Sequence, residues 1–253
     1  MRDIAVCVKI VPMNIAAGTI KADRTGVELN VADMAAVEAA LRLKKKDCMI
    51  TVFTMGTKAA YPILKDLLSR GVDRVVLLTD HKMAGADTYA TGVTLAAAIR
   101  YFGSFDCIFC GRRAIDGETG QVPGELAGRL KIPCITDVSR IEINEGRLYC
   151  DRLLETGTAR LEAVFPAVIS FCEYSYPLRL PSIQGKRAAA KKEVICLSAD
   201  ELGMEETQCG VKGSRTKVLD IKILESGFRN GMVERNIEAG VERMISIVNE
   251  MRK

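Results

Sequence analysis

The chain has 253 residues, a formal net charge of +4 and 48% hydrophobic residues. That length can bury a sizeable core, and the modest charge, without interleaved aromatic and basic residues, argues against nucleic acid as a partner. The longest run without a charged residue, at 88–99, is shorter than the roughly 18 apolar residues of a membrane span, and no apolar leader follows Met1. We therefore expect a cytoplasmic protein with no membrane span, in which most of the nine cysteines are buried apolar side chains and none is a metal ligand.

The first half of the chain alternates short apolar runs with amphipathic segments. Strands are expected at 4–11, 49–55, 72–79 and 107–110, the first of them ended by Pro12. Helices are expected at 58–70, 87–102 and 121–130, after an earlier helix that begins at Asp33 as its N-cap and ends at the lysines 44–46. This alternation predicts an α/β fold with a mostly parallel sheet flanked by helices.

The pattern changes after residue 130. Strands are expected at 132–138 and 140–149, with a hairpin turn at 144–146, and at 163–172. Residues 174–190 are interpreted as a basic loop with prolines, 218–224 alternate between apolar and polar side chains, and 232–251 form a last helix with an apolar face. We divide the chain into an α/β nucleotide-binding body at 1–195 and a C-terminal arm with a partner-docking helix at 196–253.

A strand, a charged turn and a helix start follow one another at 105–130. The strand ends at Gly111, and the turn up to Gly120 contains Arg112, Arg113 and Thr119. The first N–H groups of a helix have no partner within the helix, and the helix dipole adds positive potential there, so this unit is suited to bind a phosphate. The alternative, an ordinary surface loop with a capped helix, stays open.

Segments distant in sequence are expected to meet at this site. The carboxyl ends of parallel strands lie at one edge of a sheet, and this edge should therefore gather Cys7, Met55 and the segments 80–91 and 111–122. No catalytic constellation is evident among them. Asp116 and Glu118 follow two arginines and are interpreted as charge-balanced loop residues, and the single histidine, His81, receives no catalytic role. The site is interpreted as a binding site.

Several motifs resemble one protein family. The segment CGRRAIDGETGQV at 110–122 resembles CGxQAIDGDTxQV in the β subunit of electron-transfer flavoproteins, and NVADMAAVEAALRL at 30–43 resembles NPxDxxAxEEAxRL of the same family. GADTYAT at 85–91 is similar to GADTxAT of its electron-bifurcating branch, and PSIQGKRAAAKKE at 181–193 to its SIRGKxKAKKKE loop. The resemblance covers about residues 1–200.

This resemblance implies an adenine-nucleotide α-hydrolase-like layer and a heterodimer with an α subunit that carries the main FAD. The β chain of this family binds either AMP or, in the bifurcating branch, a second FAD. By position, the resemblance and the helix start near 87 assign cofactor-binding roles to Cys7, Asn30, Val31, Ala32, Asp33, Met55, Asp87, Thr88, Thr91, Gly111, Arg112, Arg113, Ala114, Ile115, Asp116, Gly117, Glu118, Thr119, Gly120, Gln121 and Val122.

Partner recognition is assigned to Ile183, Lys186 and Arg187, because Ile183 matches the apolar anchor that the family presents to acyl-CoA dehydrogenases. The other possibility is that Ile183 packs inward. The resulting hypothesis is an electron carrier whose second FAD accepts electrons from NADH. Two alternatives remain: a non-bifurcating carrier with structural AMP, and an ATP-using adenylating enzyme, for which residues 8–14 offer no phosphate loop.

Overall fold

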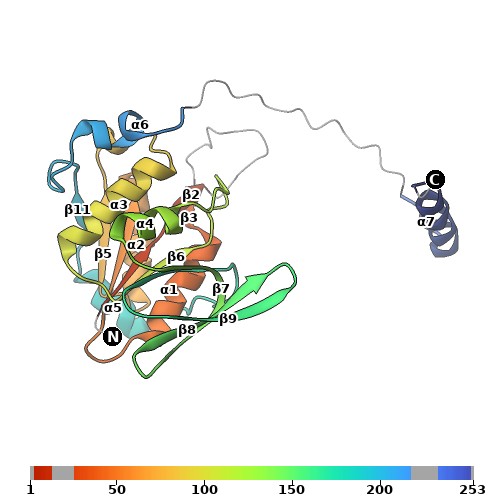
Figure 1. Cartoon of the computed structure of the whole chain (residues 1–253), viewed down its shortest axis with the longest axis horizontal. Helices are drawn as coiled ribbons and strands as arrows, with labels where there is room; N and C mark the ends of the chain where they lie inside the picture. Colours follow the sequence, from red (N-terminus) through yellow and green to blue (C-terminus); the bar gives the residue numbers. More distant parts are fainter. Residues whose placement is uncertain (1–2, 13–25, 218–232, 252–253) are drawn as a thin grey trace. The chain divides into compact units, whose positions relative to one another are not determined.

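The computed structural model describes residues 3–12, 26–217 and 233–251. The chain divides into two compact units, residues 1–220 and 221–253. The described part of the first unit contains a nine-stranded sheet in the order β11-β5-β4-β1-β6-β10-β7-β8-β9 (Figure 1). Neighbours from β11 to β7 run parallel, and β8 and β9 continue the sheet as antiparallel hairpins. The predicted α/β fold with a mostly parallel sheet is confirmed.

The strands of the large sheet are β1 (Asp3–Cys7), β4 (Met49–Met55), β5 (Arg74–Leu78), β6 (Cys107–Gly111), β7 (Cys134–Asn144), β8 (Arg147–Leu154), β9 (Gly157–Ala163), β10 (Ala167–Phe171) and β11 (Ile195–Leu197). A separate ladder pairs β2 (Ile10–Pro12) with β3 (Val27–Leu29). The helices of the first unit are α1 (Val31–Leu43), α2 (Tyr61–Ser69), α3 (Thr88–Phe102), α4 (Val122–Leu130), α5 (Ile183–Ala190) and α6 (Gly210–Gly213), with short 3-10 turns η1 (Lys58–Ala60), η2 (His81–Met83) and η3 (Glu206–Gln208). The second unit contains α7 (Ile237–Met251).

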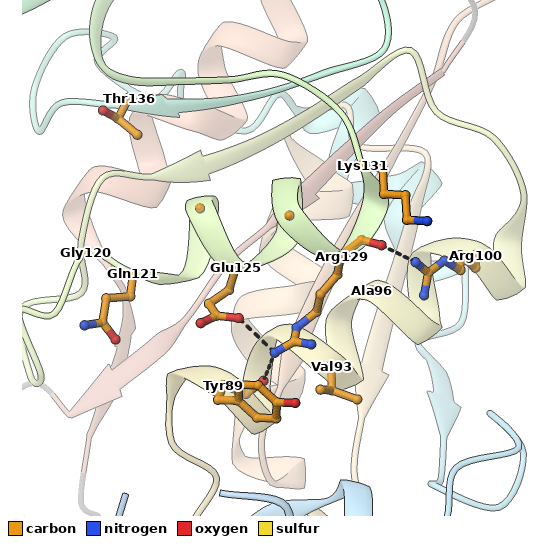
Figure 2. A pocket seen from close by; sticks show the side chains of 12 residues that line it. Tyr89, Val93, Ala96, Arg100, Gly120, Gln121, Glu125, Arg129, Lys131 and Thr136 are labelled. Carbon is orange, nitrogen blue, oxygen red and sulfur yellow. Dashed lines mark hydrogen bonds and ion pairs between the residues drawn. The ribbon is translucent and has the colours of Figure 1, made fainter. Parts of the chain in front are cut away.

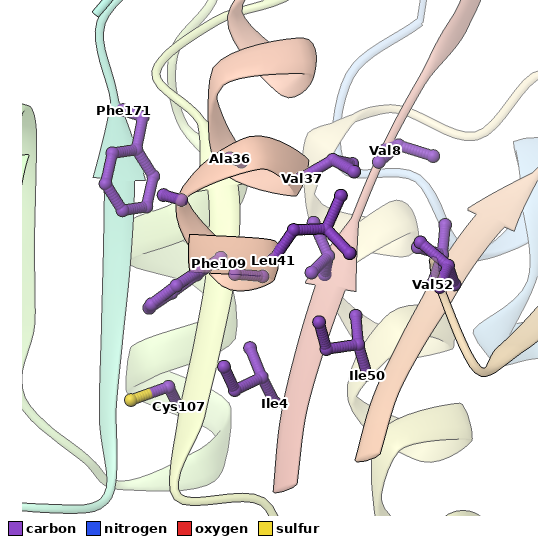
Figure 3. Packing of buried hydrophobic residues seen from close by; sticks show 14 of the residues in the cluster. Ile4, Val8, Ala36, Val37, Leu41, Ile50, Val52, Cys107, Phe109 and Phe171 are labelled. Atoms are coloured by element: carbon purple, nitrogen blue, oxygen red, sulfur yellow. The ribbon is translucent and has the colours of Figure 1, made fainter. Parts of the chain in front are cut away.

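The strands bury side chains on both faces of the sheet. Alternate residues of a strand point to opposite faces, so Ile4 joins the core beneath α1 (Figure 3), to which α2 and α5 also contribute. Ala5 joins the core beneath α3 and α4. The pair Cys107 and Cys110 has Cys-x-x-Cys spacing but lies within β6, and its two thiols fall in different cores. Both are free and buried, as small apolar side chains are.

The first strand is shorter than predicted. β1 ends at Cys7, and the chain then leaves the sheet for β2, because the Lys9 N–H donates to a carboxylate oxygen of Asp33 at 2.7 Å instead of to a neighbouring strand. Asp33 is therefore not the N-cap of α1. The N-cap is Asn30, and Asp33 lies buried in the first turn.

The second half differs from the predicted elements in several places, among them the following. The stretch 134–144 is one strand, β7, and the predicted turn before β8 is present at Glu145 and Gly146, both with positive φ. β9 was not predicted, because its alternation of polar and apolar residues is interrupted by small ones. Residues 183–190, expected as loop, form α5, whose N-cap Ser182 accepts a hydrogen bond from the Gly185 N–H at 2.9 Å.

The last predicted helix begins later than expected, at Ile237, and the alternating segment 218–224 lies outside the described residues. Within the described ranges, no helix combines the length and the hydropathy that crossing a membrane requires. The first compact unit extends past residue 195 through β11, η3 and α6, and the functional division at 195 remains a prediction.

Candidate functional site

A cavity of about 880 Å³ lies at the carboxyl ends of β1, β4, β5 and β6 and at the starts of α3 and α4. Its walls come from separate stretches of sequence that the parallel sheet brings together, as the position of the strand ends predicts. The predicted site residues that line it are Cys7, Asp33, Met55, Asp87, Thr88, Thr91, Gly111, Arg112, Arg113, Ala114, Gly117, Glu118, Thr119, Gly120, Gln121 and Val122.

The other predicted residues lie around the cavity instead of in its lining. Asn30 is fully buried; its side-chain Nδ2 donates to the Arg113 carbonyl at 2.9 Å, and its Oδ1 accepts from the Ile115 N–H at 3.1 Å. Asp116 pairs with the Lys9 ammonium at 2.7 Å. Val31 and Ala32 belong to the first turn of α1. The bonds of Asn30 hold the 111–120 loop against the start of α1.

Asp33 joins two strand ends. Its Oδ1 accepts from the Gly111 N–H at the end of β6 at 2.8 Å, and its Oδ2 accepts from the Lys9 N–H beyond β1. Burial raises the pKa of this carboxyl to about 7, although hydrogen bonds from Lys9, Asn30 and Gly111 oppose the shift. Asp33 thus takes up a proton in the neutral range, in the wall of the cavity.

The free energy of unfolding should depend on pH through Asp33. The folded state binds the proton of Asp33 more tightly than the unfolded state, in which the pKa is about 3.8. The contribution of Asp33 to the free energy of unfolding is therefore largest below pH 4 and is lost as the pH rises to about 7. We expect a loss on the order of 1 kcal/mol per pH unit across this window. Asp33→Asn should remove this part of the slope in urea unfolding, whereas Asp200→Asn, at an exposed carboxylate, should keep it. Equal slopes in wild type and Asp33→Asn would contradict the assignment.

The starts of α3 and α4 both border the cavity. Among the described residues no side chain caps α4, and the first-turn N–H groups of a helix have no partner within the helix, so this start is suited to an anion. Its second residue, Pro123, supplies no N–H. α3 is capped by Asp87, whose Oδ1 accepts from the Ala90 N–H at 2.9 Å. The Thr88 hydroxyl donates to Gln121 Oε1 at 2.7 Å and connects the two helix starts.

The arginines of the loop are already paired. Arg112 and Arg113 contact the carboxylate of Glu173 at 3.1 and 3.2 Å, and Arg113 also lies 3.9 Å from Glu118. Glu173 follows β10 and was not singled out from the sequence, since nothing local distinguishes it from other surface carboxylates. Because nearby carboxylates neutralise these arginines, backbone N–H groups would contribute more than side-chain charge to the binding of an anion in this cavity.

A second hollow crosses the outer surface of α3 and α4 (Figure 2). Arg129 of α4 lies over the ring of Tyr89 of α3, with its guanidinium carbon 4.2 Å from the ring centroid, and donates to Glu125 at 2.8 Å. Gln121 borders both this hollow and the cavity. The hollow and the cavity therefore meet at the start of α4.

The predicted recognition residues lie on α5. Ile183 is 75% exposed, so the possibility that it packs inward is wrong. Lys186 and Arg187 follow within the same helix, and Leu180, not singled out from the sequence, is also exposed. A Cβ at Gly185 would meet the Ser69 carbonyl oxygen at 2.0 Å, so α5 packs closely on α2 and holds Ile183 at the surface.

Comparison with known proteins identifies the family. The family described as "Electron transfer flavoprotein domain" matches residues 18–202. The chain belongs to the electron transfer flavoprotein family. It is 38% identical over 223 residues to the electron transfer flavoprotein subunit beta of Thermoanaerobacterium thermosaccharolyticum, covering 87% of this chain and 85% of the relative. It is 36% identical over 260 residues to the corresponding subunit of Megasphaera elsdenii, covering 96% and 94%. The caffeyl-CoA reductase-Etf complex subunit CarD of Acetobacterium woodii is 33% identical over 223 residues, covering 85% of each chain.

Proposed function

We propose that this electron transfer flavoprotein β subunit binds a second FAD in the cavity and acts in a heterodimer with an α subunit that carries the other flavin. Electrons would pass from NADH, by bifurcation, through the α-subunit FAD to an acyl-CoA dehydrogenase-type partner. The observation that carries the proposal is the convergence of two helix starts on one cavity, because FAD has two phosphates where AMP has one. A bound flavin would supply the redox chemistry, and the residues of this chain would bind and orient it.

Each of the two helix starts would bind one phosphate of the FAD. The uncapped start of α4, reached through Gly120 with its positive φ, offers backbone N–H groups to one phosphate. Thr91 of α3 lines the same cavity and would offer its hydroxyl group to the second phosphate. The Thr88 hydroxyl could do the same only after releasing Gln121 Oε1. The resemblance of GADTYAT at 85–91 to the two-flavin branch supports this arrangement.

Structural AMP is the second candidate, and one observation favours it. Asp87 places a carboxylate at the start of α3, which satisfies the Ala90 N–H and leaves α4 as the stronger anion site. An ATP-using adenylating enzyme has less support, because the sequence at 8–14 contains no glycine-rich phosphate loop.

Two exposed surfaces fit the proposed partners. In the second unit, α7 exposes apolar side chains along its length, among them Ile237, Met244 and Met251, and such a face is suited to cover an apolar groove of an α subunit. In the first unit, α5 exposes Ile183 beside basic side chains, and this surface is suited to a redox partner.

Extraction of the bound nucleotides from the purified heterodimer decides between FAD and AMP. We expect two FAD and no AMP per heterodimer, because both helix starts of the cavity would hold phosphates of the same ligand. One FAD with one AMP would overturn the bifurcating proposal and leave a simple carrier. ATP turnover by the isolated chain would instead favour the adenylating enzyme.

A further inference from the structure

A C-terminal segment of the first unit, residues 214–216, is bound to the start of α3. The second carboxylate oxygen of Asp87 accepts from the Arg215 N–H at 2.7 Å, the Thr216 N–H at 2.9 Å and the Thr216 hydroxyl at 3.0 Å. In return, the Asp87 N–H donates to the Ser214 hydroxyl at 2.9 Å. Asp87 therefore caps α3 with one oxygen and holds the segment with the other.

Arg215 adds a second attachment. Its guanidinium carbon lies 4.7 Å from the centroid of the Tyr89 ring, and its Nη2 lies 3.3 Å from the Tyr89 hydroxyl. The same ring is contacted by Arg129, which Figure 2 shows beside it. A cation over an aromatic ring is attracted by the negative potential of the ring face, so Tyr89 contacts arginines from both α4 and the segment.

The held segment reaches the cavity. Thr216 lines it together with Asp87, Thr88 and Thr91 of the α3 start. Thr216 lies beyond residues 1–195, the body predicted from the sequence to bind the nucleotide. Part of the cavity wall is thus supplied by a segment that is attached mainly through one carboxylate.

The charge of Asp87 makes this attachment important for an anionic ligand. Although burial opposes ionisation, hydrogen bonds from Ala90, Thr216 and Arg215 lower the pKa of Asp87 to about 2, so its carboxylate is ionised at neutral pH. Three donors from the segment surround this charge. Without them the bare carboxylate would face the same cavity as a phosphate and repel it.

We propose that residues 214–216 are part of the nucleotide site, and that their attachment to Asp87 and the binding of a nucleotide phosphate strengthen each other. The proposal rests on the nucleotide cavity of the proposed function and holds for either FAD or AMP. Coupling between two binding events is reciprocal, so the nucleotide should also protect the segment.

Thr216→Pro tests whether the attached segment strengthens nucleotide binding, because it removes two donors to Asp87 and leaves the carboxylate in place. In the heterodimer, freed of bound nucleotide, we expect the Kd for FAD or AMP to rise about tenfold, as for lost hydrogen bonds to a charged group. Thr216→Val, which removes only the hydroxyl, should give a smaller rise. The matched control is Lys212→Ala, which removes a nearby cation paired with Glu206 and should leave the Kd unchanged.

A second background isolates the role of the charge. Asp87→Asn keeps an N-cap side chain but has no negative charge to expose, so adding Thr216→Pro to Asp87→Asn should raise the Kd less than it does in wild type. An equal rise in both backgrounds would overturn the charge mechanism.

Limited trypsin digestion tests the reciprocal direction. Cleavage after Arg215 should slow when FAD or AMP is added to the nucleotide-free heterodimer, and this protection should shrink in Thr216→Val. If Thr216→Pro binds nucleotide like Lys212→Ala and cleavage of the wild type is insensitive to nucleotide, this inference is wrong while the nucleotide site stands. Asn30→Ala removes the side chain that holds the 111–120 loop and should bind FAD and AMP less tightly than the wild type. If the wild type itself binds neither FAD nor AMP, the nucleotide site and the inference are wrong together.

Discussion

Gly111→Ala is expected to abolish nucleotide binding and to lower the free energy of unfolding by about 3 kcal/mol, the upper range for overpacking in a filled core. A Cβ at this position would lie 2.2 Å from Asp33 Oδ1, 2.8 Å from Ala32 Cβ and 2.8 Å from the Asp33 N. Two of these neighbours belong to a carboxylate and a backbone that are fixed by hydrogen bonds, so the start of α1 would have to move away from β6. That movement would displace Asn30 and the 111–120 loop together.

Gly128→Ala is the matched control for this substitution. Gly128 lies within α4, and a Cβ there meets nothing within 4 Å, so alanine should stabilise the helix by roughly 0.5–1 kcal/mol. Urea unfolding and nucleotide content of the two variants provide the comparison. Full nucleotide content in Gly111→Ala would show that α1 and β6 can separate without loss of the site, and that the bond between Asp33 and Gly111 is not needed to form it.

Much of the fold follows from local pattern. The strand at 49–55 is predicted with its observed bounds because it is a largely apolar run without charged residues that Gly56 ends. The helix at 87–102 is predicted from apolar side chains that recur on one face, and the structure places the Asp87 side chain at its N-cap. Such elements depend on residues within a few positions of one another, and the sequence displays these directly.

Contacts over long distances in sequence explain the elements that were missed. Asp33 looks like an N-cap by position, yet its partners are Lys9 and Gly111, which no local pattern connects to it. α5 was interpreted as loop because prolines precede it and basic residues occupy it, and its packing on α2 through Gly185 is a tertiary contact. Tertiary context thus overrides the local signal at these positions.

The candidate site divides in the same way. Its strand ends and helix starts could be predicted, since parallel strands place their carboxyl ends at one edge. The contribution of Thr216 could not, because the segment around it is neither periodic nor close in sequence to the other walls. The pairing of Arg112 and Arg113 with Glu173 was missed for the same reason. These parts of the site form only when loops that are distant in sequence come together in the fold, so no local sequence pattern predicts them.

Ile183→Ala should slow electron transfer to an acyl-CoA dehydrogenase-type partner by about ten- to thirtyfold, the loss typical of a buried hot-spot side chain in an interface. Ile183 is exposed at the start of α5 and is held there by the Ser182 cap and the close packing of Gly185 on α2. A rigid, exposed apolar side chain loses little conformational entropy when a partner covers it, so most of its burial energy is available for binding.

The rate measurement should be paired with nucleotide content and with electron transfer to a free dye. Both should be unchanged in Ile183→Ala, because the side chain does not line the cavity. Leu154→Ala, at an exposed leucine on β8, is the matched control and should transfer electrons at the wild-type rate. Loss of nucleotide or of dye reduction in Ile183→Ala would show that α5 is needed for the fold instead of for recognition.

Lys186 and Arg187 should raise the association rate with the partner by electrostatic attraction, and this effect should weaken at high salt. A transfer rate that is independent of ionic strength would argue that these two side chains take no part in the encounter.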